Sequence, residues 1–202
     1  MISEVAYQLM SVLAGKLLFF DKWGGLVTPL RKSVNGTEKV FPVFQQTPSD
    51  CDKSVFMDLV PDSSKTSIAY VELISEPTFE PLYSTVYLVS ASLRIVVWYN
   101  LDRISEGMYL SGDALSADVF TQMPRSLPNS AMQYCKNVQI YPVGFKQGAS
   151  LFDAYTYEEV RTQFVTHPYG ACAVDVDVQY TISQCATTIT PELKCNQPDY
   201  VD

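Results

Sequence analysis

The strongest candidates for chemistry are two aspartates near the end of the chain. Asp175 and Asp177 lie two residues apart in the stretch GACAVDVDVQYTISQ, residues 170–184. Alternate residues of a β-strand point to the same face, so the two carboxylates would lie side by side, as paired acids or cation ligands do. A strand with one face in water produces the same spacing without a site, and we favour that interpretation.

Five cysteines and a single histidine are the other candidates. No C-x-x-C pair occurs, and one histidine permits no zinc-site spacing. Acidic neighbours raise the pKa of a thiol, so Asp50 and Asp52 argue against a reactive Cys51. Buried thiols in a reducing compartment and a structural histidine are favoured over a nucleophile at Cys51 or Cys172. The residues are Cys51, Cys135, Cys172, Cys185, Cys195 and His167.

Recognisable catalytic motifs are absent from the sequence. There is no G-x-S-x-G, no phosphate-binding glycine loop and no H-E-x-x-H. The tripeptide Asn35-Gly36-Thr37 matches a glycosylation sequon, but Glu4 precedes the first apolar run, so we expect no secretory signal. Lys16 interrupts that run before it reaches the ~18 apolar residues of a membrane span. We expect a soluble, intracellular protein that is not an enzyme and binds no metal or cofactor.

The composition argues against nucleic acid as a tightly bound partner and is compatible with contacts between subunits. A net charge of −8 argues against a protein that binds nucleic acid through contacts with its phosphates. The 202 residues are 47% hydrophobic and 12% aromatic, with 18% charged, below the roughly 25% of an ordinary domain. Tyrosine-rich, charge-poor surfaces are typical of subunit contacts, but a large sheet with a big core explains the same numbers.

The stretch Ser84–Leu101 organises the predicted fold. Its only charge is Arg94, and β-branched and aromatic residues predict a central antiparallel strand rather than a buried helix. Alternate residues form one apolar face and a second face that is polar in the middle. Trp98 and Tyr99 mark either the far end of the core or a subunit contact.

A β-hairpin is predicted over residues 26–44. Asn35-Gly36 provides a type I′ turn, which places Pro29 opposite Pro42 and Lys32 opposite Lys39. A like-charge pair is tolerable only in water, and the prolines deny a donor to an outer strand. The hairpin is therefore an exposed arm or, alternatively, an edge hairpin of the main sheet.

The remaining patterns complete an α+β fold, a mainly antiparallel sheet packed by two or three helices with a projecting hairpin arm. We expect a single domain over residues 1–184 and a C-terminal extension over 185–202. The expected elements are a helix from Ile2 to Leu13 with Ser3 as N-cap and Gly15 as a stop; a turn at Gly24-Gly25; strands at 66–74, 137–145 and 170–184; a connection at 76–82; and helices at 116–123 and 155–164.

The order of these elements resembles the tail-terminator and head–tail connector proteins of tailed bacteriophages. The stretches that carry the likeness are ISEVAYQLM, LVTPLRKSVNGTEKVFPVF, PDSSKTSIAYVEL and VDVDVQYTI. The segment from Cys51 to Leu73 is also similar to neck proteins of crAss-like phages. The likeness is one of fold, which does not fix function.

The resemblance implies a homo-oligomeric ring of six-fold or twelve-fold symmetry that joins the portal or other neck and tail proteins. DNA would pass through as cargo, without a membrane partner, first in the host cytoplasm and then in the virion. An acidic wall would let DNA slide. The implied subunit contacts are Pro29, Asn35, Gly36, Pro42, Trp98 and Tyr99, and the implied channel wall is Glu158, Glu159, Asp175 and Asp177. The alternative is a small soluble ligand- or protein-binding module without catalysis, with an apolar pocket between sheet and helices.

Overall fold

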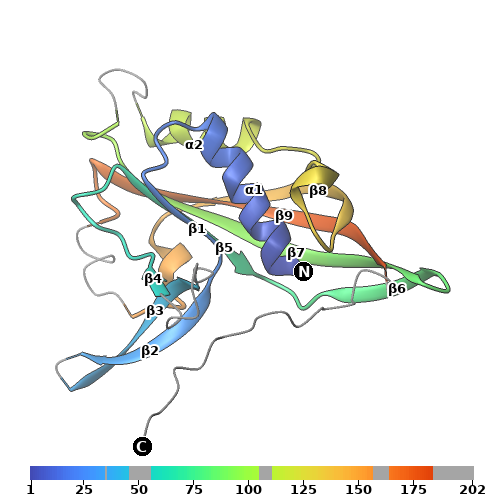
Figure 1. Cartoon of the computed structure of the whole chain (residues 1–202). Helices are drawn as coiled ribbons and strands as arrows, with labels where there is room; N and C mark the ends of the chain where they lie inside the picture. Colours follow the sequence, from blue (N-terminus) through green and yellow to red (C-terminus); the bar gives the residue numbers. More distant parts are fainter. Residues whose placement is uncertain (35, 46–55, 105–110, 157–163, 184–202) are drawn as a thin grey trace, which may run out of the picture.

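The computed structural model describes residues 1–34, 36–45, 56–104, 111–156 and 164–183. These ranges contain a six-stranded sheet, a three-stranded sheet and two α-helices (Figure 1). Apart from the parallel pair β1–β5, every strand pair is antiparallel. The predicted α+β class with a mainly antiparallel sheet is confirmed.

The six-stranded sheet is built around its two longest strands, β7 and β9. They pair along their whole length, and the strand order is β1-β5-β7-β9-β8, with β6 beside the first half of β7. The strands predicted at 66–74, 84–101, 137–145 and 170–184 are confirmed as β5, β7, β8 and β9, and β8, which contains Pro142, lies at one edge of the sheet. The bounds are β1 Lys22–Leu26, β5 Ser67–Leu73, β6 Thr78–Tyr83, β7 Val86–Asn100, β8 Lys136–Gln147 and β9 Tyr169–Ser183.

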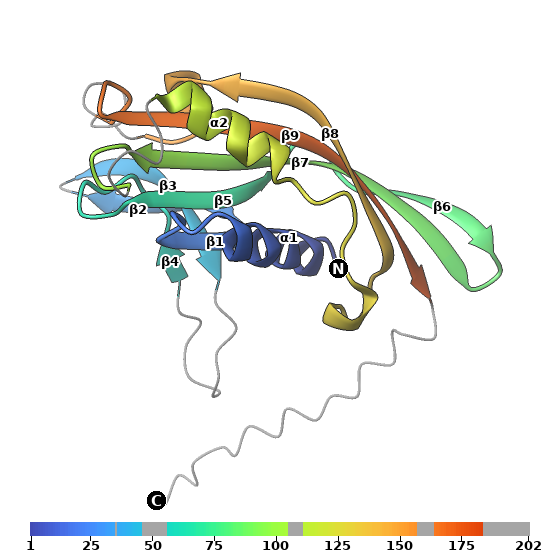
Figure 2. The same ribbon diagram turned by 90° about the horizontal axis from the view of Figure 1, so that it is seen from above.

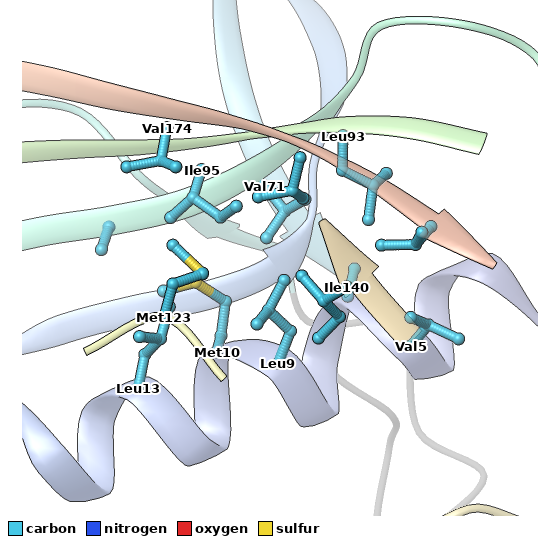
Figure 3. Close-up of a cluster of buried hydrophobic side chains, with 14 of the residues drawn as sticks. Val5, Leu9, Met10, Leu13, Val71, Leu93, Ile95, Met123, Ile140 and Val174 are labelled. Carbon is cyan, nitrogen blue, oxygen red and sulfur yellow. The ribbon is translucent and has the colours of Figure 1, made fainter. Parts of the chain in front are cut away.

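Two helices, α1 (Ile2–Lys16) and α2 (Gly112–Thr121), cover one face of this sheet (Figure 2). The apolar stripe of α1 packs on the apolar alternate residues of β5, β7 and β9 (Figure 3). The N-terminal helix is confirmed, but Met1 is its N-cap, Ser3 lies inside the first turn and Gly15 inside the last. Helix α2 begins four residues earlier than predicted, because Ser111 Oγ accepts the Ala114 N–H at 3.3 Å.

The three-stranded sheet, β2 (Thr28–Val34), β3 (Thr37–Gln45) and β4 (Phe56–Asp58), lies against the opposite face. The predicted register is confirmed: Pro29 pairs with Pro42 and Lys32 with Lys39. The alternative of an edge hairpin in the main sheet is wrong, because β2 and β3 pair with each other and with β4 in a separate sheet. Gly36 in the turn has φ +78°, as a type I′ turn requires, and Asn35 lies outside the described residues.

The Gly24-Gly25 pair is not the predicted turn. Both glycines lie inside β1, where the two sheets approach closely. A Cβ on Gly24 would lie 2.7 Å from Leu59 Cδ1 and 2.8 Å from Phe44 Cβ. The sequence therefore places glycine here to make room for packing, not for a change of chain direction.

Residues 76–82 are not the predicted connection, because most of them form strand β6, antiparallel to the start of β7. Its Pro81 is compatible with an edge strand, which needs no donor on its outer side. The helix predicted over 155–164 falls largely on residues 157–163, outside the described residues. Among the helices that the structure describes, none is long and apolar enough to cross a membrane.

Candidate assembly surfaces

Trp98 and Tyr99 belong to the core of the chain itself. Trp98 is fully buried, stacks on Tyr169 with ring centroids 5.6 Å apart, and donates its indole N–H to the carbonyl oxygen of Phe164 at 2.8 Å. Tyr99 is 5% exposed on the helix-covered face. The predicted subunit contact at these two residues is wrong, and the alternative, the far end of the core, is correct.

The hairpin of β2 and β3, residues 28–45, projects from one end of the molecule and is called the β2–β3 arm below (Figure 1). Pro29 and Gly36 are exposed on it. Pro42 is buried, and its carbonyl oxygen accepts the Leu59 N–H at 2.9 Å. The arm therefore leaves Pro29 and Gly36 available to a partner, but Pro42 anchors the arm to β4 and cannot be the predicted subunit contact.

Asp175 lies on the face of the sheet opposite the helices, but its charge is already matched. Arg94, its cross-strand neighbour, donates Nε–H and Nη2–H to the two carboxylate oxygens at 2.7 and 3.1 Å, and Lys146 Nζ lies 3.0 Å away. Burial raises the pKa of Asp175, but the hydrogen bonds from Arg94 and Lys146 outweigh it and lower the pKa below its ordinary value. This carboxylate stabilises the sheet and leaves little free charge for a channel wall.

Asp177 shares that face, as predicted, yet its surroundings differ. It is exposed and accepts the Ser92 hydroxyl at 2.7 Å, with Tyr141 of β8 opposite it. In the parts of the chain that the structure describes, no group of three or more His, Cys, Asp or Glu residues is placed to hold a metal. Asp177 remains available to line a surface, whereas Glu158 and Glu159 lie outside the described residues.

The sequence patterns missed Glu72, which extends the charged row next to Asp175. The register places Glu72 opposite Arg94 and Arg94 opposite Asp175, so acid, base and acid alternate across three strands. Tyr155 donates its hydroxyl to Glu72 Oε1 at 2.7 Å, and burial raises the pKa of this carboxyl above its ordinary value. The row borders the buried apolar side chains between the two sheets, among them Tyr70, Val96 and Ala173, so it has a structural role at the edge of that part of the core.

The described cysteines are buried free thiols. Burial raises the pKa of Cys135 to about 12 and that of Cys172 to about 11, so both stay protonated at neutral pH. A thiolate nucleophile is therefore disfavoured at Cys172. Cys51, Cys185 and Cys195 lie outside the described residues. His167 is exposed, in contrast to the fully buried Cys172.

A second projection is formed by residues 74–92, called the β6–β7 arm below. Every residue of β6 is exposed. The arm lies at the end of the molecule opposite the β2–β3 arm in both views (Figures 1 and 2). The sequence patterns missed it because its prolines indicated a loop; the signal that could have found it is the alternation of apolar residues in TFEPLY, residues 78–83.

A groove of about 1070 Å³ opens between α1, β1 and the second sheet. Aromatic rings line much of it: Tyr7 stacks on Phe44 with ring centroids 6.0 Å apart, and Trp23 lies 5.5 Å from Tyr7. The charged side chains of its lining are those of Glu4, Asp21 and Lys22. A groove of this kind can take an extended peptide or an aromatic ligand.

In comparisons with known proteins, no family model matches the chain and no curated protein matches it. The fold and its surfaces therefore carry the functional argument.

Proposed function

We propose that the protein is a structural virion subunit that forms a homo-oligomeric ring in the neck or tail of a tailed bacteriophage, as a head–tail connector or tail terminator. The observation that carries the proposal is the pair of arms at opposite ends of one body. A subunit with different contact surfaces at its two ends associates head to tail, and such a contact closes into a ring when the rotation permits. The resemblance in the order of elements supports the virion context.

The charge distribution agrees with a passage for DNA. The chain carries a net charge of −8, which disfavours tight binding of phosphates. Of the aspartates on the open face, Asp177 is the one that can present its charge to a passing duplex, because Asp175 is paired with Arg94 and Lys146. In this proposal DNA is cargo and not a tightly held ligand.

The test is assembly of the purified chain. Analytical ultracentrifugation and negative-stain electron microscopy are expected to show closed rings, alone or after co-expression with portal and tail proteins. A species that remains monomeric at high concentration, and that does not assemble with those proteins, would contradict the proposal.

A second candidate is a small ligand- or protein-binding module without catalysis, and the aromatic groove favours it. This groove differs in place from the predicted pocket between sheet and helices, since it lies beside α1 and against the second sheet. Thermal shift measurements with a panel of aromatic metabolites and proline-rich peptides test it. A ligand that raises the melting temperature of the wild type but not of Trp23→Ala would support this candidate.

A further inference from the structure

The β6–β7 arm exposes apolar side chains that the described part of the chain does not cover. Phe79 is 55% exposed, Tyr83 75% and Leu82 43%, and Ile74 next to the strand is 46% exposed. Single exposed apolar residues are ordinary, but several gathered on one projection mark an interaction surface. The arm is therefore a docking surface for a protein partner.

The charges of the two arms are complementary. Residues 74–92 contain two acids, Glu76 and Glu80, and no base. Residues 28–45 contain three bases, Arg31, Lys32 and Lys39, and one acid. The β6–β7 arm is thus acidic, and the β2–β3 arm has a net positive charge.

The β2–β3 arm also contains a like-charge pair whose repulsion a partner would relieve. Lys32 and Lys39 lie directly opposite each other across β2 and β3, and like charges in that position are destabilising. Asp58 compensates in part, with Oδ1 at 3.3 Å from Lys32 Nζ, but this pair is almost half exposed. Carboxylates from outside the chain would complete the compensation.

We propose that the β6–β7 arm of one copy receives the β2–β3 arm of a second copy of this chain. The contact joins copies head to tail, because the two arms lie at opposite ends of each molecule. This inference rests on the proposed ring and adds which surfaces form its subunit contact. The register pairs Glu80 with Leu88 and Tyr83 with Val86, so these two side chains lie on one face of the arm, the face that also carries Asp177. On that face the carboxylates of Glu76 and Glu80 meet the lysines of the neighbour, and Tyr83 loses its contact with water.

The contact forms through side chains and not by addition of a strand to a sheet. Pro29 in β2 and Pro81 in β6 have no backbone N–H to donate, which weakens both strands as templates for further pairing. Side-chain docking of opposite charges depends on ionic strength. We expect the ring to dissociate more readily as salt is raised.

The experiment uses two charge-reversed forms of the full chain. One is Glu76→Lys with Glu80→Lys, and the other is Lys32→Glu with Lys39→Glu. Each alone places like charges in every contact, and we expect association at least about tenfold weaker in analytical ultracentrifugation. An equimolar mixture restores opposite charges at every contact, so we expect mixed rings from two forms that do not assemble separately.

The matched control is Asp102→Lys with Asp153→Lys, which changes the net charge as much as the first form but lies on neither arm. It should assemble like the wild type. All forms are first compared by thermal melting; Glu76, Glu80 and Lys32 are exposed and Lys39 is half-buried, and we expect folded proteins. Should a reversal unfold the chain, Tyr83→Ser tests the same surface without a change of charge.

The outcomes separate this inference from the proposed function. A wild-type ring that both reversed forms also build would overturn the arm-to-arm contact and leave the ring intact. Reversed forms that stay apart after mixing would overturn it as well. A wild type that stays monomeric at every concentration and with the portal and tail proteins contradicts both.

Discussion

Asp175 and Asp177 form the residue pair whose spacing first indicated chemistry, and the structure gives them different roles. Both lie on the open face of β9. The side chain of Asp175 is 17% exposed and forms ion pairs with Arg94 and Lys146. Asp177 is exposed and accepts a hydrogen bond from the Ser92 hydroxyl. Alternation predicted the shared face, but the cross-strand neighbours decided the roles, because register brings Arg94 to one aspartate and Ser92 to the other.

The Asp175→Asn substitution is expected to lower the free energy of unfolding by about 1–3 kcal/mol at neutral pH, since it leaves Arg94 and Lys146 without their shared carboxylate. The pKa of Asp175 is lowered in the folded state, so its stabilisation is present above the unfolded value of about 3.9 and is lost as the pH falls through the folded value. The difference from wild type should therefore shrink in acid.

Urea unfolding of this variant between pH 3 and pH 7 measures the effect. The control is Asp177→Asn, which should change stability by less than about 0.5 kcal/mol, because an amide oxygen can still accept the Ser92 hydroxyl. Equal losses from the two variants would show that the ion pairs with Asp175 add nothing.

Glu72 has the opposite pH dependence. Burial raises its folded pKa, so the folded state favours the protonated form, and stability is lost as the pH rises from the ordinary value of about 4.3 through the raised one. Glu72→Gln keeps an acceptor for the Tyr155 hydroxyl and removes the buried charge. We expect a variant up to about 1 kcal/mol more stable than wild type at neutral pH, and equal to it in acid.

Denaturant unfolding at several pH values measures the difference between the two proteins. The stability advantage of Glu72→Gln over wild type should increase as the pH rises from the ordinary to the raised pKa of Glu72, and it should stay constant above that range. A difference that decreases with pH would show that attraction to Arg94 outweighs the cost of burial.

At the scale of elements, sequence patterns did not predict the strands β1, β4 and β6, and glycine or proline is the reason in β1 and β6. Glycine and proline commonly occur in turns and loops, so they indicate the end of a strand. In β1 the glycines allow Phe44 and Leu59 to approach, and in β6 Pro81 lies on an edge strand. Whether a glycine or proline ends an element depends on its neighbours in space, which local sequence does not contain.

Two glycine-to-alanine substitutions test the close approach of the sheets. At Gly24 the added methyl meets Leu59 and Phe44 below 3.0 Å, so we expect a loss of about 1–3 kcal/mol from overpacking. At Gly15 in α1 nothing lies within 4 Å of the added methyl, and helix propensity predicts a gain of up to about 1 kcal/mol. Thermal melts should move in opposite directions, and a stable Gly24→Ala variant would contradict the packing argument.

At the scale of the whole molecule, the main sheet is covered by helices on one face except along β6, and it is partly covered on the other face. Helices bury the first face, while the three-stranded sheet covers the end of the second face that contains Trp98. The β6 end of the main sheet and the turn end of the β2–β3 hairpin extend beyond this body (Figure 1). Stability should therefore reside in the body and assembly in the arms.

The Trp98→Ala substitution tests whether stability resides in the body of the molecule and not in its arms. The indole is fully buried between the sheets, so its removal should cost about 3–5 kcal/mol and weaken the cooperative unfolding of the whole chain. Tyr83→Ala, at the 75% exposed end of β6, should leave the unfolding midpoint nearly unchanged. Denaturant unfolding followed by tryptophan fluorescence and far-UV circular dichroism measures both, and a large loss from Tyr83→Ala would place part of the core in the arm.

The sequence by itself determined the α+β class, the long strands β7 and β9, the N-terminal helix and the register of the β2–β3 hairpin. These features follow from periodicity and turn chemistry, which act between residues close together in the chain. Tertiary structure alone decided that Trp98 and Pro42 are buried, that Arg94 and Lys146 neutralise Asp175, and that β6 is an exposed strand. Each depends on which segments, distant in sequence, pack together, and burial and ion pairing are set by those contacts.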